Sequence, residues 1–191
     1  GESCHDYPME PLGAWATGFA ATAVGGLAYS AGYEVRAYTL REVTAAVLPA
    51  GSNPIKVLHL SDLHMTPPQR KKQQWLQDLA ATKPDLVIVT GDFLAHKDAV
   101  LPVIESLAGL RDVPGVFVFG SNDYYAPTFK NPARYLFSDD GKRFHGDDLP
   151  WQELKSRLED FGWHDLTHRK VNLNVCGTAI EFRGVDDAHL Q

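Results

Sequence analysis

Cysteine is scarce in this chain of 191 residues, which contains only Cys4 and Cys176, far apart and in unrelated contexts. A disulfide framework or a Cys-rich zinc site needs several cysteines at regular spacing, so neither is indicated. Basic residues are also few, with 18 Lys and Arg against 24 Asp and Glu, which gives a formal net charge of −6. A general nucleic-acid-binding protein would carry a basic face, so no nucleic-acid partner is expected. A phosphate substrate is still compatible, because a bound metal ion can supply positive charge locally.

Charged residues are absent from Leu12 to Tyr33, a stretch rich in Ala and Gly that Glu10 and Glu34 bound. About 20 residues is the length of a membrane span. Three interpretations stay open for segment 1–34: a membrane anchor or uncleaved signal-like segment, a helix packed on the domain or on a partner, and a cleaved signal peptide. The last is the least favoured, because no basic region precedes the apolar stretch. Since the chain lacks an initiator Met, we expect that its natural start lies elsewhere.

Residues 35–54 are typical of an extended arm and linker, and residues 55–191 of one α/β domain. Apolar runs bounded by turn residues predict strands, and apolar residues at helical spacing predict helices. The predicted strands are 55–60, 85–90, 116–119, 171–175 and 178–185, and the predicted helices are 69–83, 97–110 and 151–161, with a long loop over 124–149. This order predicts an α/β sandwich in which the first three strands run parallel.

Three consecutive basic residues, Arg70, Lys71 and Lys72, stand near the start of the first predicted helix. A solvated helix face is the ordinary interpretation of such a run. If the N-terminal segment is an anchor, the same face could meet anionic lipid.

Metal-competent side chains follow the first three predicted strands. Asp62 and His64 come just after the first strand, and Asp92 follows the second. In an open α/β sheet, sites are built at the carboxyl ends of the strands. On an extended segment, residues at i and i+2 lie on the same side, so one ion could take an oxygen from Asp62 and a nitrogen from His64. The carboxylate of Asp92 could bridge two ions about 3.5–4 Å apart, which predicts metal-assisted hydrolysis.

Three short motifs at these strand ends resemble a known family. They are Ser61-Asp62-Leu63-His64, Thr90-Gly91-Asp92 and Gly120-Ser121-Asn122-Asp123. They look like the first three motifs of the calcineurin-like metallophosphoesterases. Further segments are similar to a bacterial, membrane-linked subgroup: His59–Met65, Gly115–Tyr124, Lys130-Asn131-Pro132, Leu149-Pro150-Trp151 and Gly184–Asp187. The resemblance covers about 35–191 and implies an α/β fold of β-sheets flanked by helices, with a dinuclear metal centre at the strand ends.

By this resemblance, Asp62 and His64 would bind the first metal and Asp92 would bridge both. The third motif departs from the family's Gly-Asn-His-Asp or Gly-Asn-His-Glu pattern. Without a gap, Ser121 falls where the family has a metal-binding Asn, and Asn122 where it has a His that helps the leaving group depart. A one-residue shift would bring Asn122 to the metal, and we favour Asn122 as the ligand because an amide oxygen is the better neutral donor.

The altered third motif offers no imidazole as a general acid. The leaving group would then need a proton from Asp123, another His or water. Within this motif, Asn122 and Asp123 are the candidate catalytic residues. The resemblance also calls for a lone His and a Gly-His-x-His motif, both beyond Gln191. We therefore expect a C-terminally incomplete domain, and a chain that is inactive when tested alone.

These observations predict a metal-dependent phosphoesterase that hydrolyses a phosphomonoester, phosphodiester or pyrophosphate by a metal-activated water. The expected cofactors are two divalent ions from among Mn, Fe, Zn and Mg. The expected partner is a phosphate-ester substrate, with a lipid-linked one as a candidate, and the expected location is the membrane or otherwise the cytoplasm. The alternative is a catalytically degenerate scaffold of the same fold at the membrane. A nucleotide-binding module is disfavoured, because no Gly-rich phosphate loop opens a helix.

Overall fold

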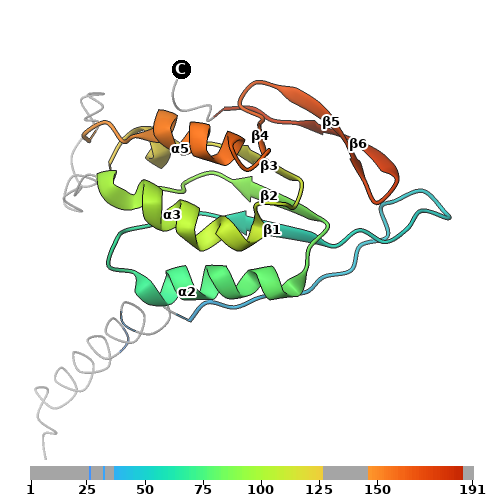
Figure 1. Cartoon of the computed structure of the whole chain (residues 1–191), viewed down its shortest axis with the longest axis horizontal. Coiled ribbons are helices and arrows are strands. Elements are labelled where there is room, and N and C mark those ends of the chain that lie inside the picture. The colour runs from blue at the N-terminus through green and yellow to red at the C-terminus, as the bar shows by residue number, and fades with distance from the viewer. Residues whose placement is uncertain (1–25, 27–31, 33–36, 127–145, 187–191) are drawn as a thin grey trace, which may run out of the picture. The chain divides into compact units, whose positions relative to one another are not determined.

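The computed structural model describes residues 26, 32, 37–126 and 146–186 (Figure 1). The chain divides into two compact units, Gly1–Val43 and Thr44–Gln191, of which the second carries the domain. The predicted apolar stretch 12–33 lies outside the described residues apart from Gly26 and Gly32. Within the described part of the chain, no helix combines the length and the apolar character that crossing a membrane requires. Residues 37–56, which include most of the predicted arm, form neither helix nor strand.

The domain is built on a four-stranded sheet with the order β1-β2-β3-β4. The strands are β1 (Val57–Ser61), β2 (Leu86–Thr90), β3 (Gly115–Val118) and β4 (His164–Asp165), and all neighbours pair in parallel. Ser61 pairs with Thr90, which pairs with Val118. The carboxyl ends of the first three strands are therefore level at one edge of the sheet, as the parallel arrangement predicted.

Three helices cover one face of this sheet (Figure 1). They are α2 (Arg70–Asp78), α3 (Val100–Leu107) and α5 (Trp151–Glu159), with α3 lying between the other two. Short 3₁₀ segments extend the first two, at Leu79–Thr82, Lys97–Ala99 and Ala108–Leu110. A four-residue helix, α4 (Ser121–Tyr124), begins three residues after the last residue of β3. The predicted α/β fold, a parallel sheet flanked by helices, is confirmed.

The core lies between the sheet and these helices, and the alternation of residues in β1 shows which face of that strand it covers. In β1, Leu58 and Leu60 are buried whereas Val57, His59 and Ser61 are exposed. The buried set from the other elements of this layer is Val87, Val89, Phe117, Leu76, Leu79, Val100, Val103, Leu107, Leu154 and Leu158. This packed layer fixes the strand ends that carry the predicted site.

A separate antiparallel hairpin completes the described fold. It consists of β5 (Lys170–Val175) and β6 (Thr178–Arg183), joined through Cys176 and Gly177. Both turn residues have positive φ, +50° and +83°, as a two-residue hairpin turn of the type I′ requires. The predicted pair of strands is therefore confirmed, whereas the two-residue strand β4 was not predicted.

Candidate metal centre

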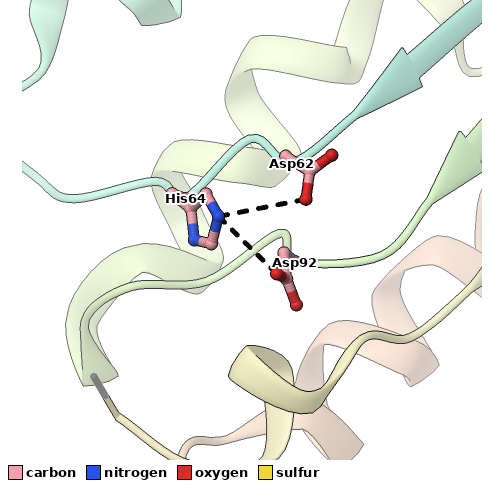
Figure 2. Close-up of side chains that lie close together, drawn as sticks. All are labelled: Asp62, His64 and Asp92. Carbon is pink, nitrogen blue, oxygen red and sulfur yellow. Dashed lines mark ion pairs between the residues drawn. The ribbon is translucent and has the colours of Figure 1, made fainter. Parts of the chain in front are cut away.

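Three potential ligands converge at the carboxyl edge of the sheet. Asp62 directly follows β1, His64 lies two residues later, and Asp92 lies two residues after β2. The Nε2 atom of His64 is 3.6 Å from Oδ2 of Asp92 and 4.0 Å from Oδ1 of Asp62. Figure 2 shows the imidazole within reach of both carboxylates, and one ligand atom from each residue lies within 4.8 Å of the others. The side chains are 64% (Asp62), 41% (His64) and 16% (Asp92) exposed, so the cluster opens to solvent on the Asp62 side.

All three residues have left-handed backbone conformations, with φ of 53° at Asp62, 40° at His64 and 51° at Asp92. Such a conformation costs a residue other than Gly about 1 kcal/mol or more, and it persists where surrounding contacts impose it. Residues of this kind are frequent at functional sites. The prediction that Asp62 and His64 lie on an extended segment is therefore wrong, although their side chains do approach one another.

Backbone hydrogen bonds hold these conformations in place. We call residues 62–65 the first loop and residues 91–94 the second loop. The N–H of His64 donates to the carbonyl of Asp92 at 2.8 Å, and the N–H of Met65 donates to that of Phe93 at 2.8 Å. The N–H of Asp62 donates to the carbonyl of Gly91 at 3.3 Å. The two ligand-bearing loops are thus paired along their length.

Gly120 opens the third motif, residues 120–123, which consists of Gly120 and the first three residues of α4 and which we call the third loop. A Cβ atom at this position would collide with the carboxylate Oδ1 of Asp92. The φ of Gly120 is −106°, which any residue can adopt, so the need for glycine here is steric. The close approach brings the third loop against the side chain of Asp92.

Asn122 contacts the carboxylate of Asp92 twice. Its backbone N–H donates to Oδ1 at 3.1 Å, and its side-chain Nδ2 donates to Oδ2 at 2.9 Å. These contacts put Asn122 beside the cluster, as the shifted alignment of the third motif requires. Its amide oxygen is the atom that a metal would use, and that role stays a prediction.

Asp123 is fully buried and links the second and third loops. Its Oδ1 accepts from the N–H of Leu94 at 2.9 Å, and its Oδ2 accepts from the N–H of Gly120 at 3.0 Å. Burial raises the pKa of Asp123 to about 6, the two backbone donors oppose the rise, and the charge of Asp92 adds to it. The predicted proton-donor role of Asp123 stays a prediction, while its contacts show a carboxylate that ties two loops together.

The donor set fits a divalent cation. Ligand atoms that each lie about 2.0–2.2 Å from one ion are at most about 4.4 Å apart, which the separations of 3.6 and 4.0 Å satisfy. Two carboxylates and one imidazole suit zinc, iron and manganese, and the carboxylates also suit magnesium. Asp62, His64 and Asp92 are therefore a possible ligand group.

Comparison with known proteins identifies the family. The model of the calcineurin-like phosphoesterases matches residues 55–182. This chain belongs to the calcineurin-like phosphoesterase family. The matched segment includes all three loops at the strand ends, so the resemblance read from the motifs is confirmed, and the parallel sheet flanked by helices is the expected fold of this family.

Two relatives of this phosphoesterase domain are similar at a moderate level. A transmembrane protein with a metallophosphoesterase domain from Bos taurus is 28% identical over 131 residues, which are 66% of this chain and 30% of that protein. An uncharacterized metallophosphoesterase, YkoQ, from Bacillus subtilis (strain 168) is 28% identical over 145 residues, 73% of this chain and 46% of that protein. The chain thus spans less than half the length of either relative.

Two residues beside the cluster were not assigned to the site from the sequence. Gly120 carries no side chain that would signal its contact with Asp92. Lys72 was interpreted as part of a solvated helix face, but its Nζ donates to the backbone carbonyl of Leu63 at 2.6 Å. A sequence shows neither contact, because one is a steric limit and the other has a main-chain acceptor.

Proposed function

We propose that the three loops form part of the active site of a metal-dependent phosphoesterase. The observation that carries the proposal is the convergence of Asp62, His64 and Asp92 at one sheet edge in a member of this family. The proposed substrates are phosphomonoesters, phosphodiesters or pyrophosphates, whose P–O bonds are the kind that metal-assisted hydrolysis cleaves.

In this proposal Asp62 and His64 hold one divalent ion. Asp92 has two carboxylate oxygens and would help to hold both that ion and a second one, for which Asn122 would offer its amide oxygen. The ions are two of manganese, iron, zinc or magnesium. When bound, they supply Lewis-acid activation of water and neutralise negative charge on the phosphoryl group.

The chain's own residues orient this chemistry. Asn122 holds the carboxylate of Asp92 through two hydrogen bonds, and Asp92 is largely enclosed. Asp62 is mostly exposed, so we propose that substrate approaches from its side. Orientation of this kind matters because a misplaced ligand weakens both metal binding and catalysis.

Protonation of the leaving group is the step for which the third motif offers no imidazole. Asp123 has a pKa of about 6 and can therefore carry a proton close to neutral pH. Its two oxygens are, however, engaged by the N–H groups of Leu94 and Gly120 inside the protein. We propose Asp123 or water as the proton donor, and the enclosure of Asp123 favours water.

Membrane association is a further part of the proposal. It is supported by the charge-free stretch from Leu12 to Tyr33 and by the relative named a transmembrane protein. A lipid-linked phosphate ester is accordingly a candidate substrate.

One observation favours an alternative function. The loop Gly120-Ser121-Asn122-Asp123 contains no histidine, whereas the family pattern has one at this motif. A catalytically degenerate scaffold that keeps the fold would tolerate this loss. Metal content and turnover, both measured on the full-length protein, distinguish the scaffold from the enzyme.

The test of the proposed centre is Asp92→Asn, assayed by Mn²⁺ titration, metal content per chain and hydrolysis of a bis-aryl phosphodiester. We expect metal affinity to fall by orders of magnitude, because the substitution removes the charge of the bridging ligand. Any hydrolysis seen with the unaltered chain should fall with it.

The matched control is Asp78→Asn, which removes one negative charge from an exposed position at the end of α2. It should bind metal as the unaltered chain does. Wild-type metal content in Asp92→Asn would show that the centre is assigned to the wrong residues. One ion per chain in the full-length protein would reduce the dinuclear proposal to a mononuclear one.

A further inference from the structure

Lys72 of helix α2 contacts the first loop, although it belongs to neither the second nor the third loop. Its Nζ donates to the carbonyl of Leu63 at 2.6 Å, and Leu63 lies between Asp62 and His64. The neighbouring Lys71 is exposed, whereas Lys72 is half-buried. The two lysines follow each other on one helix but have different environments.

The backbone N–H groups of the first loop and the carbonyl of Leu63 are bonded by different elements. The N–H groups of Asp62, His64 and Met65 all donate to carbonyls of the second loop. The carbonyl of Leu63 is bonded from helix α2 instead. The first loop is therefore held from two sides. The second loop accepts hydrogen bonds from its N–H groups, and α2 donates one to the carbonyl of Leu63.

Leu63 lies between two residues with left-handed backbone conformations and is anchored by its buried side chain. Its side chain is buried in the core, with 6% of its surface exposed, and φ is 53° at Asp62 and 40° at His64. A rotation of the peptide plane at Leu63 would therefore swing the backbone that orients both potential ligands. Burial lowers the pKa of Lys72, in keeping with an ammonium group that has exchanged part of its water for a protein acceptor.

We infer that Lys72 is a positioning residue of the metal centre, whose bond to the Leu63 carbonyl fixes the orientation in which Asp62 and His64 present their ligand atoms. The inference rests on the proposed function for its metal-binding consequence, but not for the ordering of the loop. It also leaves Arg70 and Lys71, rather than all three basic residues, as the solvated face of α2.

The experiment compares Lys72→Met with Lys71→Met in the full chain. Methionine keeps a long apolar stem but cannot donate a hydrogen bond, and the two variants lose the same charge from adjacent positions. The first measurement is hydrogen exchange of the His64 amide in metal-free protein, followed by NMR. We expect faster exchange in Lys72→Met than in Lys71→Met, because the His64 amide donates to Asp92 from within the loop that Lys72 holds.

The second measurement is a Mn²⁺ titration of the same two variants. Loss of a group that orients metal ligands typically weakens affinity by about tenfold or more, and we expect that loss for Lys72→Met only. The thermal midpoint of each metal-free variant is recorded alongside, so that a general loss of stability is recognised. If Lys72→Met does not fold, Lys72→Leu against Lys71→Leu replaces the pair, with the same expectations, because leucine also cannot donate a hydrogen bond.

Equal His64 exchange in the two variants would overturn the inference whether or not metal binds. Equal Mn²⁺ affinity in the two variants, with the unaltered chain binding Mn²⁺, would overturn it as well. Failure of the unaltered chain to bind Mn²⁺ would count against the proposed function, and the exchange measurement would then decide the positioning role by itself.

Discussion

At the scale of single residues, Asp92 is the side chain on which the proposed site most depends. Both of its carboxylate oxygens accept from Asn122, its Oδ2 lies near the imidazole of His64, and its Oδ1 lies against Gly120. Its own backbone is left-handed and its carbonyl accepts from His64. A change in any of these neighbours should therefore act on the centre through Asp92.

Gly120→Ala tests this dependence without altering a charge. The added Cβ would collide with the Asp92 carboxylate and approach its backbone nitrogen, so the carboxylate must move. We expect Mn²⁺ affinity to fall by about tenfold or more, in the range found when the orientation of ligands is disturbed. The measurement is a Mn²⁺ titration of the variant beside its thermal unfolding curve.

Gly162→Ala is the control for this substitution. Gly162 has a φ of +79° and open space at the Cβ position, so alanine there should lower stability while leaving metal affinity unchanged. A Gly120→Ala variant that binds Mn²⁺ like the unaltered chain would mean that the third loop does not position Asp92.

The sequence predicted the potential ligands that follow the strands. It did not predict the residues whose contacts depend on the backbone, which are Lys72 and Gly120. Asp62, His64 and Asp92 follow apolar runs, and the parallel sheet brings such positions to one edge. Their left-handed conformations could not be predicted, because pairing between two loops imposes them. The contact of Lys72 could not be predicted because its acceptor is a backbone carbonyl. Every residue has such a carbonyl, so the sequence does not show which one Lys72 reaches.

At the scale of elements, the predicted strands and helices were those with a clear apolar period. β1, β2, β3 and the helices α2, α3 and α5 have such periods, and their ends differ from the prediction by a few residues, as helix ends commonly do. β4 has only two residues, too short for an alternation to be seen. Tertiary contacts define it: Asp165 pairs with Phe117 of β3 and binds Lys155 of α5.

The ion pair between α5 and β4 gives a prediction about stability and pH. Lys155 Nζ lies 2.6 Å from Asp165 Oδ2, with the two side chains 22% and 5% exposed. Burial alone would raise the pKa of Asp165, but the hydrogen bond from Lys155 and those from Thr167 lower it overall. Lys155→Met should therefore lower the free energy of unfolding by about 2 kcal/mol at pH 7, since a hydrogen bond to a buried charge is lost.

The sign of the pH effect follows from the lowered pKa. Asp165 binds its proton less readily in the folded protein than in the unfolded chain, so its contribution is complete above the unfolded value near 4. That contribution is lost as the pH falls through the lower folded value. The stability difference between the variant and the unaltered chain should thus shrink below about pH 4, as urea unfolding at several pH values would measure.

Arg157→Met is the control on the same helix. Arg157 pairs with Glu153 one turn away, and both side chains are about half exposed, so this pair should contribute less than about 1 kcal/mol. Equal losses of stability for Lys155→Met and Arg157→Met would show that the α5–β4 ion pair contributes no more to the free energy of unfolding than an exposed pair does.

At the scale of the whole molecule, the chemistry gathers at one edge of an acidic domain. The sequence predicted this because the hydrophobic period locates the strands and the motifs follow them. The proposed membrane association is a different kind of property, since the proposal rests on the segment before the domain rather than on the packed core. For that segment the evidence is its composition, together with the name of one relative.

Residues 1–34 are the segment on which the proposed membrane association can be tested. The stretch from Leu12 to Tyr33 has no charged residue and is about as long as a bilayer span, so burying it in lipid costs no desolvation of charge. We expect the full chain to be recovered with the membrane fraction, and a variant lacking residues 1–34 to be recovered without detergent. The control is a full chain with Ala21→Lys and Val24→Asp, because charges near the centre of a span oppose insertion by about 2.5–3.5 kcal/mol each. Recovery of all three forms in the same fraction would reject the anchor, and the stretch would then be explained as a helix that packs on the domain or on a partner.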